Sequence, residues 1–374
     1  MYFLIGLGIL LVLLYASLMC FIAYKFLAKK LVPTVPKATK HISYTIIIAA
    51  RNEAKNIGKL LQCLNQQNAT NITYNILVIN DNSTDNTIAV VANHNISNLK
   101  LINVDAHNSG KKNAITTGIK NTESTFIITL DADVVVPSNW LATIHNFITA
   151  QQNVIAIALP VFMQGVKNNL LANFQTIDFL TMQGITEVAV NNKWFAMCNG
   201  ANFLYSRKAF LAVNGFVGNA NIASGDDMFL LQKLQNKYTN GIYYLANQTA
   251  AAFTSTEPTL KLFFNQRIRW ASKAKSFTNN NVKAVLLLVY LLNVWFFIFT
   301  IFIFCNLNYA LVFVVLFILK IFAEYLLVQK VAKHFQLKAP LLKFIILQPF
   351  HIVYIILSAS FGLWGKYTWK GRPN

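Results

Sequence analysis

Paired carboxylates stand at two places in the middle of the sequence. Asp131 and Asp133 directly follow the apolar run 126–130. Two carboxylates two residues apart can bind one hard divalent cation, which can bridge the phosphates of a nucleotide. Asp226 and Asp227 begin a predicted helix, where a carboxylate can act as a general base for a hydroxyl group or can simply stabilise the helix start.

Two further polar motifs could contact a nucleotide. Lys111 follows Gly110 at the start of a predicted helix, where its ammonium group and backbone N–H groups could bind a diphosphate. Asp81 follows another apolar run and could accept hydrogen bonds from a base or a ribose. Alternatively, Asp81 or Ser83 could cap the next helix, and for Asp85 we favour such a capping role.

A third motif lies in the segment 258–277. Gln266, Arg269 and Trp270 stand there among interleaved apolar and basic residues, which include Arg267. The interleaving is typical of a basic amphipathic helix that lies on anionic lipid, and we expect this of much of the segment. Such a location does not exclude a catalytic role for Gln266, Arg269 and Trp270.

A predicted α/β domain positions these motifs. Short apolar runs predict buried strands at 44–50, 75–80, 99–104 and 126–130. The polar stretches between them predict helices from Asn52 to Leu64, up to Ala92, and from Asn113 to Lys120. This alternation predicts a mostly parallel sheet with helices on both faces. Ligands of such sheets bind beyond the carboxyl ends of the strands, where the acidic motifs from Asp81 to Asp133 stand.

Composition and four long apolar runs predict an integral membrane protein. The chain of 374 residues is 55% hydrophobic and has a mean hydropathy of +0.45, which exceeds the usual value for a soluble protein. The runs long enough to cross a bilayer are 2–24, 284–305, 307–328 and 344–364. The first run has no basic segment before it and no clear cleavage site, so we interpret it as an anchor.

Basic residues beside these runs predict the side of the membrane on which each part lies. The first run is followed by Lys25, Lys29, Lys30, Lys37 and Lys40. Positive charge there favours a cytosolic location for the middle of the chain. Lys366, Lys370 and Arg372 favour the same side for the tail, whereas four complete crossings would place the tail outside. One segment could therefore be re-entrant or interfacial, and 344–364 is the least regular of the four.

The net charge of +19, from 32 Lys and Arg against 13 Asp and Glu, suits anionic lipid or a phosphate-bearing substrate. Nucleic acid is not an expected partner, because the charge is concentrated beside the apolar runs. Within the third run, Lys320 and Glu324 could line a polar path, but we favour simple pairing or snorkelling to the membrane interface. His351 is expected to be an interior histidine with satisfied hydrogen bonds.

The order of these motifs resembles the membrane-bound family 2 glycosyltransferases, including ceramide-glucosyltransferase-like and polysaccharide-synthase-like members. The resemblance covers about 44–277. It rests on the ordered series Ala50-Arg51-Asn52-Glu53, Asn80 to Asp85, Gly110-Lys111 with Ala114 and Gly118, Asp131-Ala132-Asp133, Gly200-Ala201-Asn202, Gly225-Asp226-Asp227, and Gln266 with Arg269-Trp270. It implies a GT-A fold, which is a Rossmann-like α/β fold, together with a UDP- or GDP-sugar donor and Mg²⁺ or Mn²⁺ as cofactor.

The resemblance also implies a role for each matching residue. Asp227 would be the catalytic base, and the rest of the catalytic set would be Asp226, Gln266, Arg269 and Trp270. The implied donor-binding residues are Ala50, Asn52, Glu53, Asp81, Lys111, Asp131 and Asp133, of which Asp131 and Asp133 would also bind the metal. The chain departs from the family pattern at two places. Asn80 replaces the usual first Asp of a pair, and Gly225-Asp226 replaces the more usual residues before the base.

The sequence therefore predicts five segments. They are an N-terminal membrane anchor (1–30), a cytosolic GT-A catalytic domain (41–257), an interfacial amphipathic segment (258–280), a C-terminal membrane region (284–365) and a basic tail (366–374). The expected function is inverting transfer from a nucleotide-sugar, preferably a UDP-sugar, to a lipid or lipid-linked acceptor. The alternatives are a processive polysaccharide synthase and a non-catalytic membrane scaffold that binds nucleotide-sugar.

Overall fold

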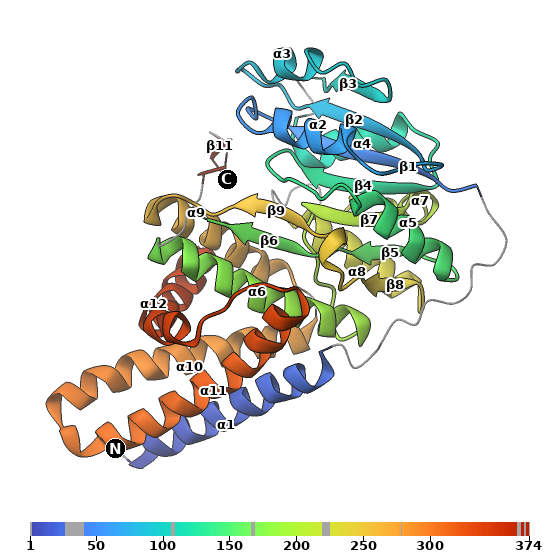
Figure 1. Ribbon diagram of the computed structural model, residues 1–374. Helices are drawn as coiled ribbons and strands as arrows, with labels where there is room; N and C mark the ends of the chain where they lie inside the picture. Colours follow the sequence, from blue (N-terminus) through green and yellow to red (C-terminus); the bar gives the residue numbers. More distant parts are fainter. Residues whose placement is uncertain are drawn as a thin grey trace. The chain divides into compact units, whose positions relative to one another are not determined.

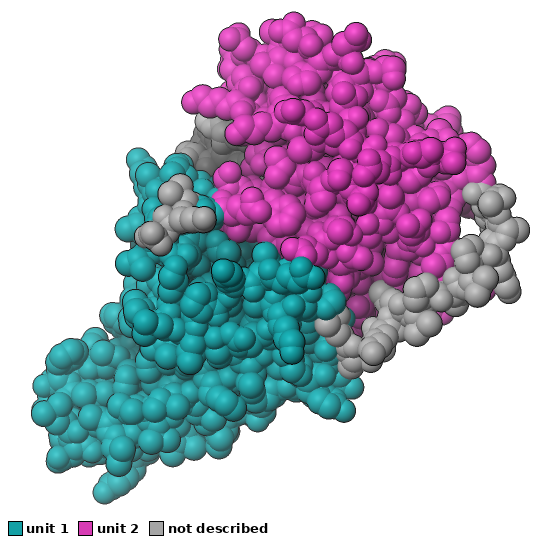
Figure 2. Space-filling view, viewed as in Figure 1, with its two compact units in different colours: residues 1–28, 165–188, 256–374 teal, residues 29–164, 189–255 magenta. Residues whose placement is uncertain are grey.

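The computed structural model (Figure 1) describes residues 2–26, 41–105, 109–165, 169–218, 225–277, 279–364, 368–369 and 372–373. Lys29, Lys30, Lys37, Lys40, Lys366 and Lys370, on which the orientation was predicted, lie outside these residues. The chain divides into two units, which are coloured in Figure 2. Unit 1 comprises Met1–Ala28, Gly165–Val188 and Thr256–Asn374, and unit 2 comprises Lys29–Gln164 and Ala189–Ser255.

Unit 2 is built around a seven-stranded sheet with the order β3-β2-β1-β4-β7-β5-β8 (Figure 1). The strands are β1 (Ser43–Ala50), β2 (Thr73–Asn80), β3 (Leu99–Asn103), β4 (Phe126–Asp131), β5 (Ala156–Ala158), β7 (Asn202–Ser206) and β8 (Ile242–Tyr244). β7 runs antiparallel to its neighbours β4 and β5, and the other neighbouring pairs are parallel. The predicted mostly parallel sheet is therefore confirmed, with the four predicted strands in it.

The helices of unit 2 follow the strands. They are α2 (Ile57–Asn65), α3 (Thr87–Ala92), α4 (Lys111–Lys120), α5 (Trp140–Ala150), α7 (Arg207–Ala212), α8 (Asp226–Lys237) and the 3-10 helix η2 (Gln248–Ala250). Gly118 lets α4 pack closely on the sheet, because a Cβ atom there would lie 2.9 Å from the Ile47 side chain. Ile46, Ile47 and Ile48 are all fully buried, as expected of a central parallel strand covered on both faces.

The helix after β1 begins five residues later than predicted. It was expected to open at Asn52 but starts at Ile57. Asn52 has φ 54°, in the left-handed region that a helix interior does not use. Its side-chain Oδ1 accepts a hydrogen bond from Thr84 N at 2.8 Å, so the residues before α2 form a turn against the turn that follows β2.

A second, two-stranded sheet lies beside the large one in unit 2. It pairs β6 (Val161–Gln164) with β9 (Ala252–Ser255) in parallel. An antiparallel bridge from Phe253 to Val135 joins β9 to the segment that follows β4. β9 is thereby connected to the residues just after Asp131 and Asp133.

Unit 1 contains long helices. They are α1 (Tyr2–Lys25), α6 (Leu170–Asn191, of which the residues up to Val188 belong to this unit), α9 (Leu260–Ala271), η3 (Ser272–Ser276), α10 (Asn280–Cys305), η4 (Leu307–Tyr309), α11 (Ala310–His334) and α12 (Leu341–Trp364). Two short strands, β10 (Thr368–Trp369) and β11 (Arg372–Pro373), follow. α1, α10, α11 and α12 have the length and apolar composition of membrane spans, which confirms the four predicted runs. Figure 1 shows α1 running alongside α11.

Small residues and polar contacts hold the apolar helices together. At Gly8 of α1, a Cβ atom would lie 2.1 Å from the Trp295 ring of α10, so only glycine allows this approach. The Trp295 indole N–H donates to Leu4 O at 2.8 Å. Small residues that permit close helix contact, combined with such hydrogen bonds, are typical of helix packing in membranes.

The predicted pairing of Lys320 and Glu324 is confirmed. Lys320 Nζ lies 2.7 Å from Glu324 Oε1, and the lysine is fully buried. Tyr15 OH and Gln348 Nε2 also donate to the Glu324 carboxylate, at 2.7 and 2.8 Å. Helices α1, α11 and α12 thus share one buried polar network.

The prediction for His351 is only half correct. The ring is interior, packed against Phe174 and Tyr354. Its Nδ1 atom, however, has no hydrogen-bond partner among the described residues. Aromatic packing, rather than hydrogen bonding, accounts for the position of this ring.

Candidate active site

The predicted acidic motifs meet at one edge of the large sheet. Asp131 is the last residue of β4 and pairs in register with Ala49 of β1, while Ala50 pairs with Asn80 at the end of β2. Asp81 follows immediately, and its N–H donates to Ala50 O at 2.8 Å. Parallel strands thus bring these residues to the common carboxyl edge, as the sequence predicted.

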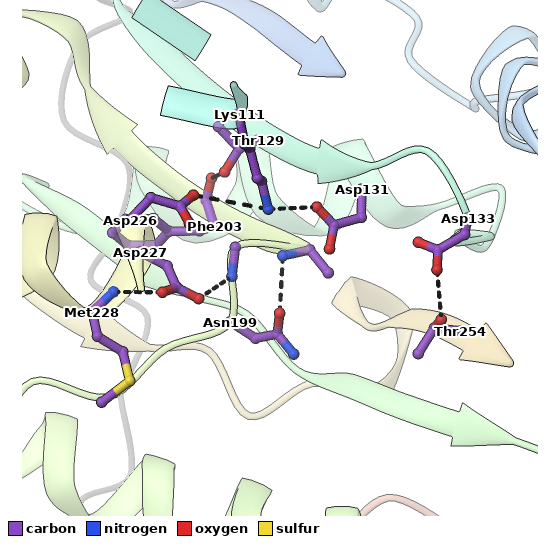
Figure 3. A network of polar contacts seen from close by, with 12 residues as sticks. Lys111, Thr129, Asp131, Asp133, Asn199, Phe203, Asp226, Asp227, Met228 and Thr254 are labelled. Atoms are coloured by element: carbon purple, nitrogen blue, oxygen red, sulfur yellow. Dashed lines mark hydrogen bonds and ion pairs between the residues drawn. The ribbon is translucent and has the colours of Figure 1, made fainter. Parts of the chain in front are cut away.

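Lys111 lies between two carboxylates, as Figure 3 shows. Its Nζ atom is 2.6 Å from Asp131 Oδ1 and 3.8 Å from Asp226 Oδ2. Gly110 precedes it with φ 116°, a conformation that favours glycine and that turns the chain into α4. The ion pairs therefore join residues from the start of α4, the end of β4 and the start of α8.

The charge of Lys111 is stabilised by this arrangement. Burial lowers the pKa of its ammonium group, but the attraction of Asp131 and then of Asp226 outweighs burial and raises the pKa well above its ordinary value. The side chain is nevertheless 23% exposed, so the ammonium group remains within reach of a ligand. A permanent cation between carboxylates can attract the phosphates of a nucleotide.

Asp227 is held by the backbone. Its Oδ2 accepts from Gly200 N and its Oδ1 accepts from Met228 N, each at 2.7 Å (Figure 3). Gly225, in the left-handed conformation with φ 83°, precedes α8 and leaves Asp226 and Asp227 in the first helical turn. Both residues are 9% exposed, and their carboxylates lie where the helix dipole favours negative charge.

Gly200 belongs to the same cluster. A Cβ atom at this position would lie 3.2 Å from Lys111 Nζ and 3.4 Å from Asp227 Cβ. The absence of a side chain therefore lets the lysine and the two carboxylates of α8 approach one another. Asn202, from the same predicted motif, has a structural role instead: its side-chain amide donates to Pro160 O and Ala250 O, each at 2.9 Å.

Asp131 and Asp133 fit a divalent cation that is shared with a ligand. The Asp131 side chain is 37% exposed and Asp133 is exposed, so both carboxylates are accessible to a hard cation. Asp133 Oδ2 also accepts a long hydrogen bond, 3.5 Å, from Thr254 Oγ1 of β9 (Figure 3). No group of three or more His, Cys, Asp or Glu within the described ranges is placed to hold a metal alone. Ligand phosphates and water would have to supply the remaining oxygen atoms, as is usual for Mg²⁺.

Asp81 joins β2 to the turn before α4. It is 2% exposed, and its Oδ1 accepts from Gly110 N at 2.9 Å. The guanidinium of Arg51 donates to Asp81 O and Asn82 O at 2.8 and 3.1 Å. Asp81 therefore does not cap α3, and the capping alternative is wrong for this residue because its carboxylate faces the next turn along the sheet.

The predicted structural role of Asp85 is confirmed. Its carboxylate accepts from Thr87 N at 3.0 Å, at the start of α3, and from Ala54 N at 3.1 Å. Glu53 is 7% exposed and accepts from Asn56 Nδ2 at 2.8 Å. Of the residues predicted to bind the donor, Ala50 ends β1, and Asn52 and Glu53 lie in the turn that follows it.

Two residues in unit 2, Tyr205 and Thr254, were not singled out from the sequence. Tyr205 of β7 is 1% exposed, and its hydroxyl has no hydrogen-bond partner among the described residues. Burial, and then the charge of Asp226, raise the pKa of this hydroxyl well above its ordinary value. Thr254 was also missed, because a single Thr on an edge strand carries no pattern.

The remaining predicted residues, Gln266, Arg269 and Trp270, lie on α9 in unit 1, whereas the acidic residues belong to unit 2. Gln266 Nε2 donates to Glu257 Oε1 at 2.9 Å. Trp270 packs against Phe179 of α6, with 5.8 Å between ring centroids. The structure thus brings these three residues together on one helix of unit 1.

The expectation that the basic residues of 258–277 lie on anionic lipid is wrong for Arg267. This residue is 5% exposed, and its guanidinium forms an ion pair with Asp178 of α6. Phe263, one turn earlier, is fully buried. One side of α9 therefore packs on protein, because its arginine finds a carboxylate there.

Comparison with known proteins supports the predicted family. A family model described as glycosyl transferase family 2 matches residues 45–213. A 4,4'-diaponeurosporenoate glycosyltransferase of Staphylococcus aureus (strain bovine RF122 / ET3-1) is 37% identical over 95 residues. That match covers 25% of this chain and 24% of the relative, so the chain matches about a quarter of the length of this relative.

The fold is shared with a solved structure. The mannosyltransferase PcManGT from Pyrobaculum calidifontis, in complex with GDP-Man and Mn²⁺, superposes with a TM-score of 0.58 at 16% sequence identity. The superposition covers 96% of this chain and 99% of the other. The expected GT-A fold with accompanying apolar helices is confirmed, and residues 45–213 of this fold match the model of glycosyl transferase family 2.

Proposed function

We propose that this protein transfers a sugar from a nucleotide-sugar to a lipid or lipid-linked acceptor at a membrane. The observation that carries the proposal is the cluster in which Lys111 lies between Asp131 and Asp226, next to Asp227, at the carboxyl edge of a family 2 domain. The four apolar helices of the same chain favour an acceptor that is held by the bilayer.

The donor would bind at the edge formed by β1, β2 and β4. Asp81 and the turn from Ala50 to Glu53 would contact the nucleoside, and Lys111 would attract the diphosphate. We favour a UDP-sugar and keep a GDP-sugar as the alternative, since the Pyrobaculum mannosyltransferase was solved with GDP-Man. Asp131 and Asp133 would hold Mg²⁺ or Mn²⁺, which supplies positive charge to the departing diphosphate when bound.

The proposed reaction is a single displacement with inversion. The Asp227 carboxylate takes the proton of the acceptor hydroxyl as its oxygen bonds to the anomeric carbon of the sugar. The bond from that carbon to the diphosphate oxygen breaks in the same step, and the nucleoside diphosphate leaves. The backbone N–H groups of Gly200 and Met228 donate to the Asp227 carboxylate and fix its direction. The ammonium of Lys111 stabilises the charge of the leaving group.

Acceptor recognition would involve Gln266, Arg269 and Trp270 of α9. A lipid-linked acceptor is consistent with the name of the Staphylococcus aureus relative, 4,4'-diaponeurosporenoate glycosyltransferase. We assign the catalytic domain to 41–257 and place it in the cytosol, with 1–30 as anchor, 258–280 at the membrane interface, 284–365 in the membrane and 366–374 as a basic tail. Lys25, at the end of α1, favours this orientation.

A panel of labelled UDP- and GDP-sugars, incubated with membranes that contain the protein, tests the proposal. Labelled product that partitions into organic solvent supports a glycolipid, whereas retained product of high mass favours the processive alternative. Donor binding without any transfer would favour the scaffold alternative. Absence of both binding and transfer for every donor would refute the proposed function.

Asp227→Asn tests the assignment of the base. The amide cannot take the acceptor proton, so we expect transfer to fall by about 100-fold or more while donor binding remains. Glu123→Gln is the matched control, because Glu123 is an exposed carboxylate of the same unit that pairs with Arg207. Turnover like that of the wild type in the Asp227 variant would remove Asp227 as the base.

Chelation tests the metal. EDTA should stop transfer, and added Mg²⁺ or Mn²⁺ should restore it. Donor binding measured with and without metal provides a second readout. Full activity in excess chelator would refute the metal assignment of Asp131 and Asp133.

A further inference from the structure

We propose that Asp178 of α6 is a positioning residue, which orients the side of α9 that carries Gln266, Arg269 and Trp270. The inference rests on the proposed function, since it assumes that these three residues serve the acceptor. It concerns contacts within unit 1 only. No motif in the sequence marks Asp178.

A buried ion pair links Asp178 to α9. Asp178 Oδ2 lies 3.0 Å from Arg267 Nη2, and the two side chains are 10% and 5% exposed. The second carboxylate oxygen, Oδ1, accepts a hydrogen bond from Tyr354 OH of α12 at 3.1 Å. Asp178 is therefore bound on one side to α9 and on the other to α12.

Arg267 in turn holds Trp270. The guanidinium carbon lies 4.4 Å from the centroid of the Trp270 ring, and 5.1 and 5.9 Å from those of Phe263 and Tyr354. Phe263, Arg267 and Trp270 are four and three residues apart, so they lie along one side of the helix. A guanidinium that is fixed by Asp178 thus fixes the indole that stacks on it.

A second link runs from α6 to Gln266. Gln175, three residues before Asp178 and fully buried, accepts from Glu257 N at 2.8 Å and donates to Glu257 O at 3.0 Å. Glu257 Oε1 then accepts from Gln266 Nε2 at 2.9 Å. Gln266 and Trp270 are therefore both tied to the same helix, through Gln175 and through Asp178.

These two ties also set the direction of Arg269. Positions 269 and 270 are three and four residues after 266, so each of them neighbours Gln266 on the surface of the helix. When the side chains at 266 and 270 are held, α9 cannot rotate about its axis, and Arg269 keeps one direction. An apolar contact would not fix this direction, because the hydrophobic effect is non-directional.

A positioning role can be separated from a purely stabilising one. Removal of one partner of a buried ion pair is destabilising, but replacement of both partners by apolar residues often leaves stability unchanged. The variants needed are Asp178→Asn, Asp178→Glu and the double variant Asp178→Leu with Arg267→Met. Thr181→Val is the matched control on α6, since the Thr181 hydroxyl donates to Ile177 O within the same helix.

The experiment measures sugar transfer, donor KM, thermal unfolding and backbone hydrogen exchange on the same preparations of the full chain in detergent. We expect the double variant to unfold near the wild-type temperature and yet to transfer sugar roughly 100-fold more slowly, because a displacement of about 1 Å is enough for such a loss. Donor KM should change by less than about threefold, since the proposed donor residues belong to unit 2. Hydrogen exchange of the double variant should increase within 260–271. Asp178→Glu, which keeps the carboxylate, should retain more activity than Asp178→Asn.

Other results would overturn the proposal. If the double variant had both the activity and the stability of the wild type, the ion pair would only stabilise the fold. Unchanged exchange within 260–271 would mean that Asp178 does not hold α9. If the wild type transfers no sugar from any donor, the proposed function fails, while hydrogen exchange still decides whether Asp178 positions this helix.

Discussion

The ammonium nitrogen of Lys111 lies 2.6 Å from Asp131 Oδ1, although the two residues stand 20 positions apart in the sequence. Lys111 comes from the start of α4 and Asp131 from the end of β4. A second carboxylate, from Asp226, is 3.8 Å from the same nitrogen. The lysine therefore separates two carboxylates that would otherwise repel each other and any phosphate that approaches them.

Replacement of Lys111 by Met should weaken donor binding. The variant keeps most of the side-chain volume but removes the cation, so Asp131 and Asp226 would repel the diphosphate. We expect donor KM to rise by about tenfold or more, measured as initial rates over a range of nucleotide-sugar concentrations. Lys120→Met, at the exposed end of the same helix, is the control. An unchanged KM would show that the Lys111 charge does not act on the donor.

Tyr205→Phe should stabilise unit 2. The Tyr205 hydroxyl is buried without a hydrogen-bond partner among the described residues. Such a group lowers the free energy of unfolding by about 1 kcal/mol or more. Phenylalanine keeps the ring contacts with Phe203 and Phe210. Thermal unfolding in detergent measures the effect, and a lower unfolding temperature for the variant would mean that the hydroxyl does have a favourable partner.

The central part of the fold could be predicted from the sequence because its signals are local. The runs at β1, β2, β3 and β4 match the observed strands to within two residues at either end. Parallel pairing then brings Asp81 and Asp131 to one edge by geometry alone. The four apolar helices were predicted by length and hydropathy for the same reason.

The contacts of α6 could not be predicted, because they depend on partners far away in the sequence. Asp178 pairs with Arg267, 89 positions later, and Gly184 approaches Val331 closely enough that a Cβ atom would lie 2.5 Å away. Neither residue belongs to a motif or a periodic pattern. The same holds for Tyr205, whose burial between β4 and β5 follows from the antiparallel insertion of β7.

The Lys320 and Glu324 pair should show strong coupling. Lys320→Met or Glu324→Gln alone leaves one buried charge without its partner. Such a change should lower the free energy of unfolding by about 3 kcal/mol or more. The double variant leaves neither charge, so it should unfold at a higher temperature than either single variant. Thermal unfolding of the three variants in one detergent checks this, and strictly additive losses would show that the two charges do not interact.

The carboxyl group of Glu257 should make stability depend on pH. Burial raises the pKa of Glu257 above its ordinary value of 4.5, and the charges of Arg269 and then Arg267 offset this only in part. The folded chain therefore binds this proton more tightly than the unfolded chain does. The resulting stabilisation is complete below pH 4.5 and is lost as the pH rises through the folded pKa.

Glu257→Gln should remove that dependence. Glutamine resembles the protonated acid and can still accept the hydrogen bond from Gln266 through its Oε1 atom. The stability of the wild type relative to this variant should therefore decrease as the pH rises from 4.5 through the folded pKa of Glu257. Thermal unfolding of both proteins across this range measures the difference, with the exposed Glu123→Gln as control. Parallel curves for the wild type and Glu257→Gln would show that burial does not raise this pKa.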